Sequence, residues 1–244
     1  MKQTITWLGH GSWKMTTEDG IEIYVDPWLD GNPACPIGIA DVKRADVVAV
    51  THGHNDHIGD SIELCKRTGA VLVTLPEVAT YANRWGIPYD QGGGTVHTGG
   101  TVTVKGVRFT ATFALHYSDI LGYEYNKDGY STMPGCGCCG FVVTPETGKT
   151  VYFAGDTGLF GDMELIGKMY RPEVAVLPVG GKYGMGVYEA SWAASLLRSP
   201  VVIPGHFNTF PNQMADMDEF ERDLKVLAPF TKLCVLTPGG SLEL

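Results

Sequence analysis

The sequence is short of positive charge, and charged residues are few overall. Its 18 Lys and Arg residues are outnumbered by 27 Asp and Glu residues, which gives a formal net charge of −9 over 244 residues. Nucleic acids and anionic membranes attract proteins that carry clustered positive charge. We therefore expect no nucleic-acid partner and no membrane partner.

Long apolar runs are also missing. No stretch is apolar over the roughly 20 residues that a transmembrane helix needs, and the N-terminus opens into a strand-like pattern without a secretory signal. We expect a cytoplasmic protein. Hydrophobic residues make up 44% of the chain, so a sizeable core can form without cross-links. The length suits one domain over residues 1–244.

The cysteines follow no zinc-ribbon spacing, and a reducing compartment excludes a disulfide framework. Three of the six, Cys136, Cys138 and Cys139, fall close together. One interpretation is a soft-metal or redox group, and the other is that small residues are needed where the chain passes close to a functional site. We favour the second, and expect this segment to shape the substrate entrance without binding metal.

Histidine is rare, with seven residues, yet three of them fall in Thr51-His52-Gly53-His54-Asn55-Asp56-His57. This stretch lies between an apolar run at 46–50, which predicts a buried strand, and helical spacing over 58–68. Residues two apart on an extended backbone point the same way, so His52 and His54 can bind one ion. Asp56 and His57, where the chain turns into the helix, can face a second metal ion. Imidazole and carboxylate without thiolate suit zinc or manganese, with iron or nickel as further options.

Three more candidate ligands each stand just past the end of an apolar, strand-like run. They are His116, Asp156 and His206. Side chains at the ends of several strands can converge at one edge of a sheet assembly. Together with the His-rich stretch they supply enough donors for two metal ions and one bridging carboxylate. Asp26, at the end of another strand-like run, is expected to accept hydrogen bonds from that stretch and to fix an imidazole tautomer.

Strands and helices are expected to alternate along the rest of the chain. The expected strands are 4–8, 21–25, 71–75, 141–144, 150–153, 174–177, 201–203 and 233–236, with a strand pair that turns at 105–106. The expected helices are 76–85, 159–170, 187–197 and 217–227. Residues 119–140 show no periodicity, and loops of this length in a compact domain usually have a function or are mobile.

With these motifs the chain resembles the metallo-β-lactamase superfamily. Within it, the sequence is similar to a family of uncharacterised metal-dependent hydrolases that also resembles ascorbate-6-phosphate lactonase. The resemblance implies the α/β class and a four-layer αββα sandwich, with the metal site at one edge of the two sheets. It covers essentially the whole chain and is strongest over residues 7–10, 26–27, 51–59, 154–163 and 203–211.

The resemblance also implies a role for each candidate. His52, His54 and His116 match the ligands of a first metal, Asp56, His57 and His206 those of a second, and Asp156 the bridging carboxylate. His10 matches a Gly-His turn near the site. His97 matches nothing and is expected to be structural or exposed.

Two such ions can hold a bridging water and lower its pKa to near neutrality, which predicts a hydrolase of esters, lactones or phosphodiesters. Asp56 is expected to orient or shuttle a proton. Lys182, Tyr183 or His10 can bind an anionic group on a small-molecule substrate, although an exposed loop lysine is an equal interpretation of Lys182.

Two alternatives stay open. One is an iron-dependent redox enzyme on the same fold, although its relatives carry glutamate where this chain has His54. The other is a metal-binding protein without catalysis. A homo-oligomer is compatible with either alternative and with the hydrolase.

Overall fold

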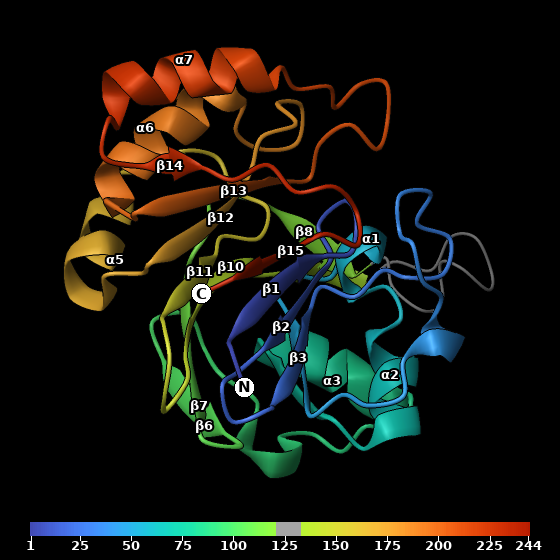
Figure 1. The fold of residues 1–244 in the computed structure, drawn as a ribbon. Helices are drawn as coiled ribbons and strands as arrows, with labels where there is room; N and C mark the ends of the chain where they lie inside the picture. The colour runs from blue at the N-terminus through green and yellow to red at the C-terminus, as the bar shows by residue number, and fades with distance from the viewer. Residues whose placement is uncertain (121–132) are drawn as a thin grey trace.

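Two β-sheets form the centre of the molecule (Figure 1). The protein is described by a computed structural model that covers residues 1–120 and 133–244, with only the backbone of 133–136. In sheet order, the first sheet contains β15 (Ser241–Glu243), β1 (Thr4–Trp7), β2 (Trp13–Thr16), β3 (Glu22–Val25), β4 (Val47–Val50) and β5 (Val71–Thr74). The second contains β14 (Lys232–Leu233), β13 (Val201–Gly205), β12 (Val174–Pro178), β11 (Val151–Phe153), β10 (Cys139–Thr144), β7 (Val107–Phe113) and β6 (Thr101–Val104).

Helices cover the outer faces of both sheets. On the first sheet lie α2 (Ser61–Thr68) and α3 (Pro76–Arg84), and on the second lie α5 (Met163–Tyr170), α6 (Val187–Leu197) and α7 (Met217–Leu227), on opposite sides of the molecule in Figure 1. Single-turn pieces are α1 (Asn55–Ile58) and the 3-10 turns Ile39–Asp41 and Gln91–Gly93. Within the described residues, no helix has the length and apolar character needed to cross a membrane.

The core explains this layering, because neighbouring residues on a strand face opposite sides of the sheet. Ile23 of β3 packs between the sheets in one cluster with Met15 and Phe109. Tyr24, the next residue, packs on the other face with Ile62 of α2. The expected αββα sandwich is therefore confirmed.

The strands that carry the candidate ligands end at one edge. In the first sheet β3, β4 and β5 are parallel. In the second, β11, β12 and β13 are parallel to one another, and β7 runs the same way because both it and β11 are antiparallel to β10. Parallel strands buried on both faces read as continuous apolar runs, as Val47–Val50 does.

Two strands of the two main sheets are absent from the strands expected from the sequence. Trp13–Thr16 forms β2, inserted between β1 and β3. Ser241–Glu243 forms β15 and pairs with β1, with Thr4 opposite Glu243. The second error has a simple cause, since no local pattern reveals a pairing between the two ends of a chain. The strand expected at 233–236 covers only Lys232–Leu233.

The helix expected at 58–68 is broken at Gly59, which adopts φ 34°. A Cβ there would lie 2.6 Å from Cα of Trp28, so the chain bends where two backbone segments cross. The helix expected at 159–170 begins only at Met163. Part of the segment expected to be irregular is a two-stranded sheet of β8 (Ser118–Ile120) and β9 (Met133–Cys136), while residues 121–132 lie outside the described residues.

Candidate metal centre

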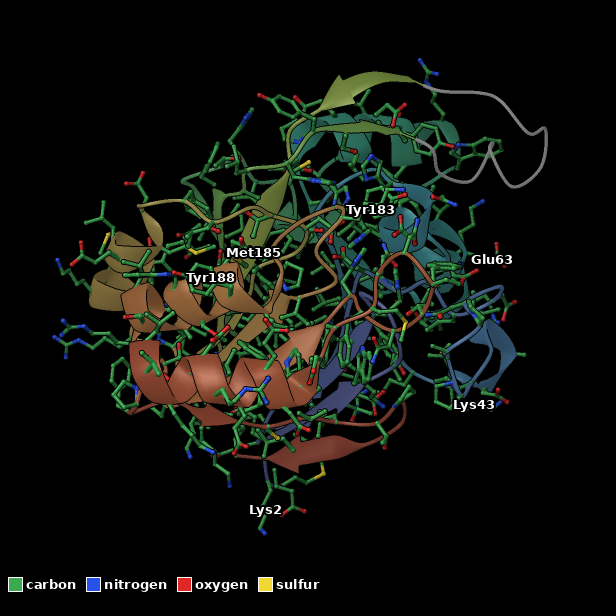
Figure 2. The ribbon with its side chains drawn as sticks, turned by 90° about the horizontal axis from the view of Figure 1, so that it is seen from above. Lys2, Lys43, Glu63, Tyr183, Met185 and Tyr188 are labelled. Carbon is green, nitrogen blue, oxygen red and sulfur yellow. The ribbon has the colours of Figure 1, made fainter. Side chains whose placement is uncertain are left out.

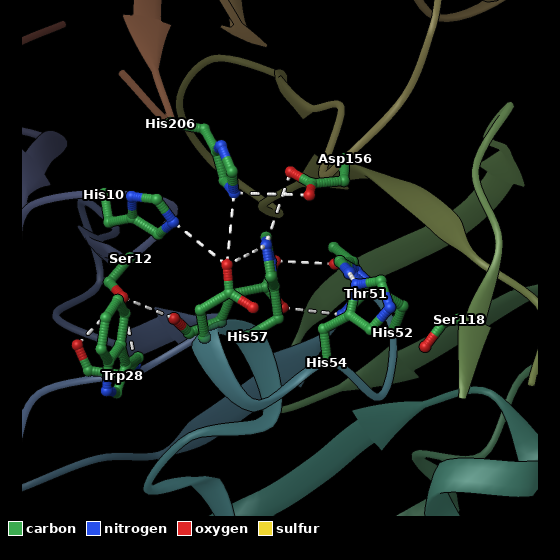
Figure 3. A network of polar contacts seen from close by, with 12 residues as sticks. His10, Ser12, Trp28, Thr51, His52, His54, His57, Ser118, Asp156 and His206 are labelled. Atoms are coloured by element: carbon green, nitrogen blue, oxygen red, sulfur yellow. Dashed lines mark hydrogen bonds and ion pairs between the residues drawn. The ribbon is translucent and has the colours of Figure 1, made fainter. Parts of the chain in front are cut away.

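All seven candidate ligands meet at the edge where the parallel strands end. Residues 52 and 54 follow β4, Asp56 and His57 lie on α1, and His116, Asp156 and His206 follow β7, β11 and β13. Each strand therefore delivers its donor from a different part of the sequence to the same place. Figure 3 shows His52, His54, His57, Asp156 and His206 there.

The first cluster contains His52, His54, His116 and Asp156, whose donor atoms lie within 4.8 Å of one another. Nδ1 of His54 is 3.0 Å from Nε2 of His52 and 3.4 Å from Nε2 of His116. Nε2 of His116 is 3.7 Å from Oδ2 of Asp156. Donors about 3.3 Å apart surround a tetrahedral zinc ion with its usual bond lengths, so these spacings fit an ion.

The second cluster is built on the same carboxylate. Nε2 of His57 lies 3.4 Å from Oδ1 of Asp156, and Nε2 of His206 lies 3.3 Å from Oδ2. Asp56 Oδ2 is 3.4 Å from His206 Nε2. Both Nε2 atoms are buried and have no hydrogen-bond partner among the described residues. Buried polar atoms normally have a partner, and a metal ion is one that would satisfy both.

Asp26 fixes the orientation of ligands in both clusters. It is buried and accepts hydrogen bonds from the Thr51 backbone N–H and from Thr51 Oγ1, both at 2.7 Å. His57 Nδ1 donates to Asp26 at 2.9 Å, which leaves the lone pair on Nε2.

Thr51 links Asp26 to His52 and so fixes the tautomer of a histidine in the first cluster. Its hydroxyl donates to Asp26, so the contact with His52 Nδ1 at 3.0 Å requires the imidazole N–H to donate and the Thr51 oxygen to accept. Nε2 of His52 then carries the lone pair and faces His54. The expected role of Asp26 in fixing an imidazole tautomer agrees with these contacts, and Thr51 is a residue that the sequence did not single out.

The electrostatics divide the histidines into two groups. Burial lowers the pKa of His52, His54 and His116, which favours their neutral, metal-binding form. Burial acts the same way on His57 and His206, but Asp156 and Asp56 hold the pKa of both rings above its ordinary value. The carboxylates therefore require positive charge in the second cluster, which protons or a cation can supply.

Three of the eight described non-glycine residues with positive φ lie at the same edge. His10, Asp26 and His206 adopt φ of 53°, 48° and 54°, in the left-handed region that non-glycine residues rarely occupy. Such conformations persist at sites where the surrounding contacts dictate them. One contact here is the bond from the His206 N–H to the His10 carbonyl at 2.9 Å, which ties the first sheet to the second.

His10 is fully buried beside the second cluster. Its Nε2 lies 3.0 Å from Oδ2 of Asp56. Burial lowers the pKa of His10, so the neutral ring donates its Nε2–H to that carboxylate. The ring also contacts Trp28 and Phe210 edge-on, with centroids 5.5 Å away in each case. His10 therefore orients Asp56 from behind.

The other candidates lie away from this cluster. His97 is exposed, as expected. Lys182 is also exposed, with Nζ 5.2 Å from the ring centroid of Tyr183, and it does not line the cavity in front of the clusters.

Cys138 and Cys139 lie close to the site but not at the substrate entrance that the sequence predicted for them. Cys138 and Cys139 are buried, and Sγ of Cys139 on β10 contacts the Thr51 carbonyl at 3.4 Å. Neither lines the cavity, and neither belongs to a metal-binding cluster among the described residues. These two are therefore core residues behind the site and not part of its entrance. The side chain of Cys136 lies outside the described residues.

Several cavity residues had no functional signal in the sequence. The cavity has a volume of about 740 Å³ and is lined, besides five of the ligands, by Trp28, Asn55, Tyr183, Phe210, Pro211, Asn212 and Gln213. Only Tyr183 was singled out as a substrate contact. Trp28 and Phe210 flank recognisable motifs, but nothing local shows that they face the same space.

The two sheets, their flanking helices and the His/Asp cluster at the strand ends define a β-lactamase superfamily domain. The model of that domain matches residues 22–207 of this chain.

The family can be stated more narrowly. The chain is 43% identical over 239 residues to a metal-dependent hydrolase of the UPF0173 family from Methanopyrus kandleri, covering 98% of this chain and 99% of that one. It is 40% identical over 240 residues to another from Methanosarcina mazei, covering 98% of each. The chain therefore belongs to the UPF0173 family of metal-dependent hydrolases. The descriptions of these relatives name no lactone, so that part of the resemblance stays a prediction.

A solved structure supports the same classification. Igni18, described as a metallo hydrolase from Ignicoccus hospitalis, is 32% identical and superposes with a TM-score of 0.83, covering 100% of this chain and 99% of that chain.

Proposed function

We propose that the two clusters hold two divalent ions bridged by Asp156, and that the protein hydrolyses an ester, lactone or phosphodiester bond in a small molecule. One observation carries the proposal. The Asp156 carboxylate is shared by the two clusters, and it lies 3.3 to 3.4 Å from two buried imidazole nitrogens that have no hydrogen-bond partner among the described residues.

The donor set suits particular ions. It consists of imidazole nitrogens and carboxylate oxygens, and no described cysteine belongs to it. Such sites bind zinc or manganese, and also iron or nickel. When bound, a pair of such ions polarises the scissile group and lowers the pKa of a water to near neutrality.

The chain's own residues supply the orientation and the proton handling. Asp26 and Thr51 hold His57 and His52 with their Nε2 lone pairs towards the site. Asp56 lines the cavity and retains 23% side-chain exposure, so it is placed to take up or deliver a proton there. Burial favours a neutral Asp56, but His57, His10 and His206 hold its pKa well below the ordinary value. It is therefore a carboxylate at neutral pH.

We expect about two metal ions per chain in protein purified without chelator. Elemental analysis of freshly prepared protein, and again after reconstitution with zinc and with manganese, measures the number and kind. A value near zero after reconstitution contradicts the site. One ion per chain contradicts the bridging role of Asp156.

The hydrolase proposal is tested by turnover of a panel of lactones, esters and phosphodiesters, with metal-loaded protein and with protein treated with chelator. Turnover that requires the ions supports it. Turnover that survives chelation, or none across the panel, contradicts it. Coloured, iron-containing protein without hydrolytic activity would instead favour the redox alternative.

Replacing His10 tests whether it acts by positioning Asp56. We expect H10A to keep about two ions while kcat/KM falls roughly 10- to 100-fold, the usual cost of losing a group that orients a ligand. H10Q retains a donor and should recover part of the loss. The matched control is Lys182→Ala. Lys182 does not line the cavity, so this variant should have the metal content and kcat/KM of the parent. Unchanged kinetics in H10A would refute the positioning role.

A further inference from the structure

The cavity in front of the two clusters has an apolar wall. The rings of Trp28 and Phe210 stack with centroids 6.3 Å apart and planes inclined by 20°. Pro211 and Tyr183 continue the lining. Phe210 is 38% exposed, although large apolar side chains are usually covered.

The wall is held in place from behind. The fully buried His10 ring contacts both aromatic rings edge-on and also bonds to Asp56. The backbone N–H of Trp28 donates to Ser12 Oγ at 3.0 Å, and its carbonyl accepts from Asn32 at 3.0 Å. The apolar surface therefore has a fixed position relative to the metal ligands, as a specificity surface requires.

Among the described residues, the cavity lining offers no cationic side chain to a second anionic group. None of the described residues that line it is Lys or Arg, and its other polar groups are neutral, namely the amides of Asn55, Asn212 and Gln213 and the hydroxyl of Tyr183. The nearby cation, Lys182, lies over the ring of Tyr183 outside the lining. A phosphate or carboxylate held against Trp28 and Phe210 would lose its hydration without gaining a charge partner.

We propose that the cavity accepts a substrate whose non-reacting part is uncharged and aromatic or apolar, packed on the Trp28–Phe210 wall, and that it discriminates against substrates with an anionic group in that position. The inference rests on the proposed hydrolase function and narrows its substrate class. Of the two equal interpretations of Lys182 from the sequence, it favours the exposed loop lysine over a residue that binds an anionic substrate group.

A matched pair of substrates tests the discrimination. Methyl 4-phenylbutanoate and monomethyl glutarate share the ester and a three-carbon spacer, and they differ in ending with a phenyl ring or a carboxylate. We expect kcat/KM, measured by proton release, to favour the phenyl ester by at least about 10-fold, because one methylene in an apolar pocket already gives about 10- to 200-fold. Equal or faster turnover of the carboxylate ester would overturn the inference while leaving the hydrolase proposal intact.

Substitutions test whether the preference for the phenyl ester comes from the Trp28–Phe210 wall. F210A should reduce kcat/KM for the phenyl ester by roughly 10-fold and leave the carboxylate ester nearly unchanged. Tyr188, an exposed aromatic residue on α6, does not line the cavity, so Y188A is the control (Figure 2). K182A should leave the ratio of the two esters unchanged. If K182A selectively lost turnover of the carboxylate ester, the interpretation that Lys182 binds an anionic substrate group would be correct instead.

Binding of an uncharged probe separates failure of the inference from failure of the proposed function. N-phenyl-1-naphthylamine fluoresces in apolar surroundings, and we expect it to bind the parent and Y188A equally, and F210A and W28A about 10-fold more weakly. If neither ester is hydrolysed but this pattern holds, the apolar site stands, ester hydrolysis is excluded, and the panel of lactones and phosphodiesters tests the rest of the proposed function. Equal binding to all four proteins would overturn the inference.

Discussion

Asp156→Ala is expected to lose metal and abolish hydrolysis together. Its carboxylate is the one group shared by the two clusters, with His116 and His206 at 3.7 and 3.3 Å from Oδ2 and His57 at 3.4 Å from Oδ1. Without it each cluster lacks a donor, and the five buried or half-buried imidazoles keep Asp56 as the remaining carboxylate of the ligand set. We expect kcat/KM to fall by roughly 1,000-fold or more, since bound ions contribute several kcal/mol to such reactions.

The matched control for this substitution is His97→Ala. His97 is exposed and belongs to no metal-binding cluster among the described residues, so H97A should keep the parent's metal content and activity. Metal content and kcat/KM, measured in parallel on D156A and H97A, test whether Asp156 is a ligand and His97 is not. Similar behaviour of the two would show that the separation of ligands from other histidines is wrong.

Asp26→Ala is expected to have the largest effect on stability. Asp26 is 1% exposed and accepts from three donors, namely the Thr51 N–H, the Thr51 hydroxyl and His57 Nδ1. Removing a buried carboxylate that satisfies several donors costs about 3–5 kcal/mol of unfolding free energy. Metal affinity should fall as well, by roughly 10- to 100-fold, because two ligand histidines lose their fixed tautomers.

Asp60→Ala is the matched control for Asp26. Asp60 accepts from the backbone N–H groups of Leu29 and Asp30, at 2.7 and 2.9 Å, and contacts no metal ligand. We expect D60A to lower the free energy of unfolding by about 1–3 kcal/mol and to leave metal affinity unchanged. Denaturant unfolding of both variants, with and without chelator, separates the direct loss of stability from the part due to metal. Equal metal affinity in D26A and the parent would refute the orienting role.

The two proposals make different demands on the site. The metal centre requires donors that several strands deliver to one edge, and the seven candidate ligands are all there. Substrate discrimination depends on residues outside that set, above all Trp28 and Phe210, which His10 connects to Asp56. A single buried imidazole thus contacts both Asp56 and the apolar wall.

Local patterns in the sequence were enough to predict several elements of the fold and most of the candidate site. The helices Val187–Leu197 and Met217–Leu227 have the bounds that their spacing predicts. The strand Val47–Val50 follows from a run of apolar, β-branched residues. The candidate ligands were recognisable for the same reason, because each stands at the end of such a run and four of them fall within residues 52–57.

The contacts between residues far apart in the chain could not be predicted from local patterns and are seen only in the folded structure. It paired β15 with β1, placed His10 against Asp56, and brought Trp28 and Phe210 together while leaving Lys182 outside the cavity. Periodicity records which face of an element is buried, and it carries no information about which distant element covers that face. The candidate metal ligands were recognisable because histidine is rare in the sequence and here falls in a dense motif or at strand ends. The proposed substrate wall was not, because tryptophan and phenylalanine also occur widely in hydrophobic cores.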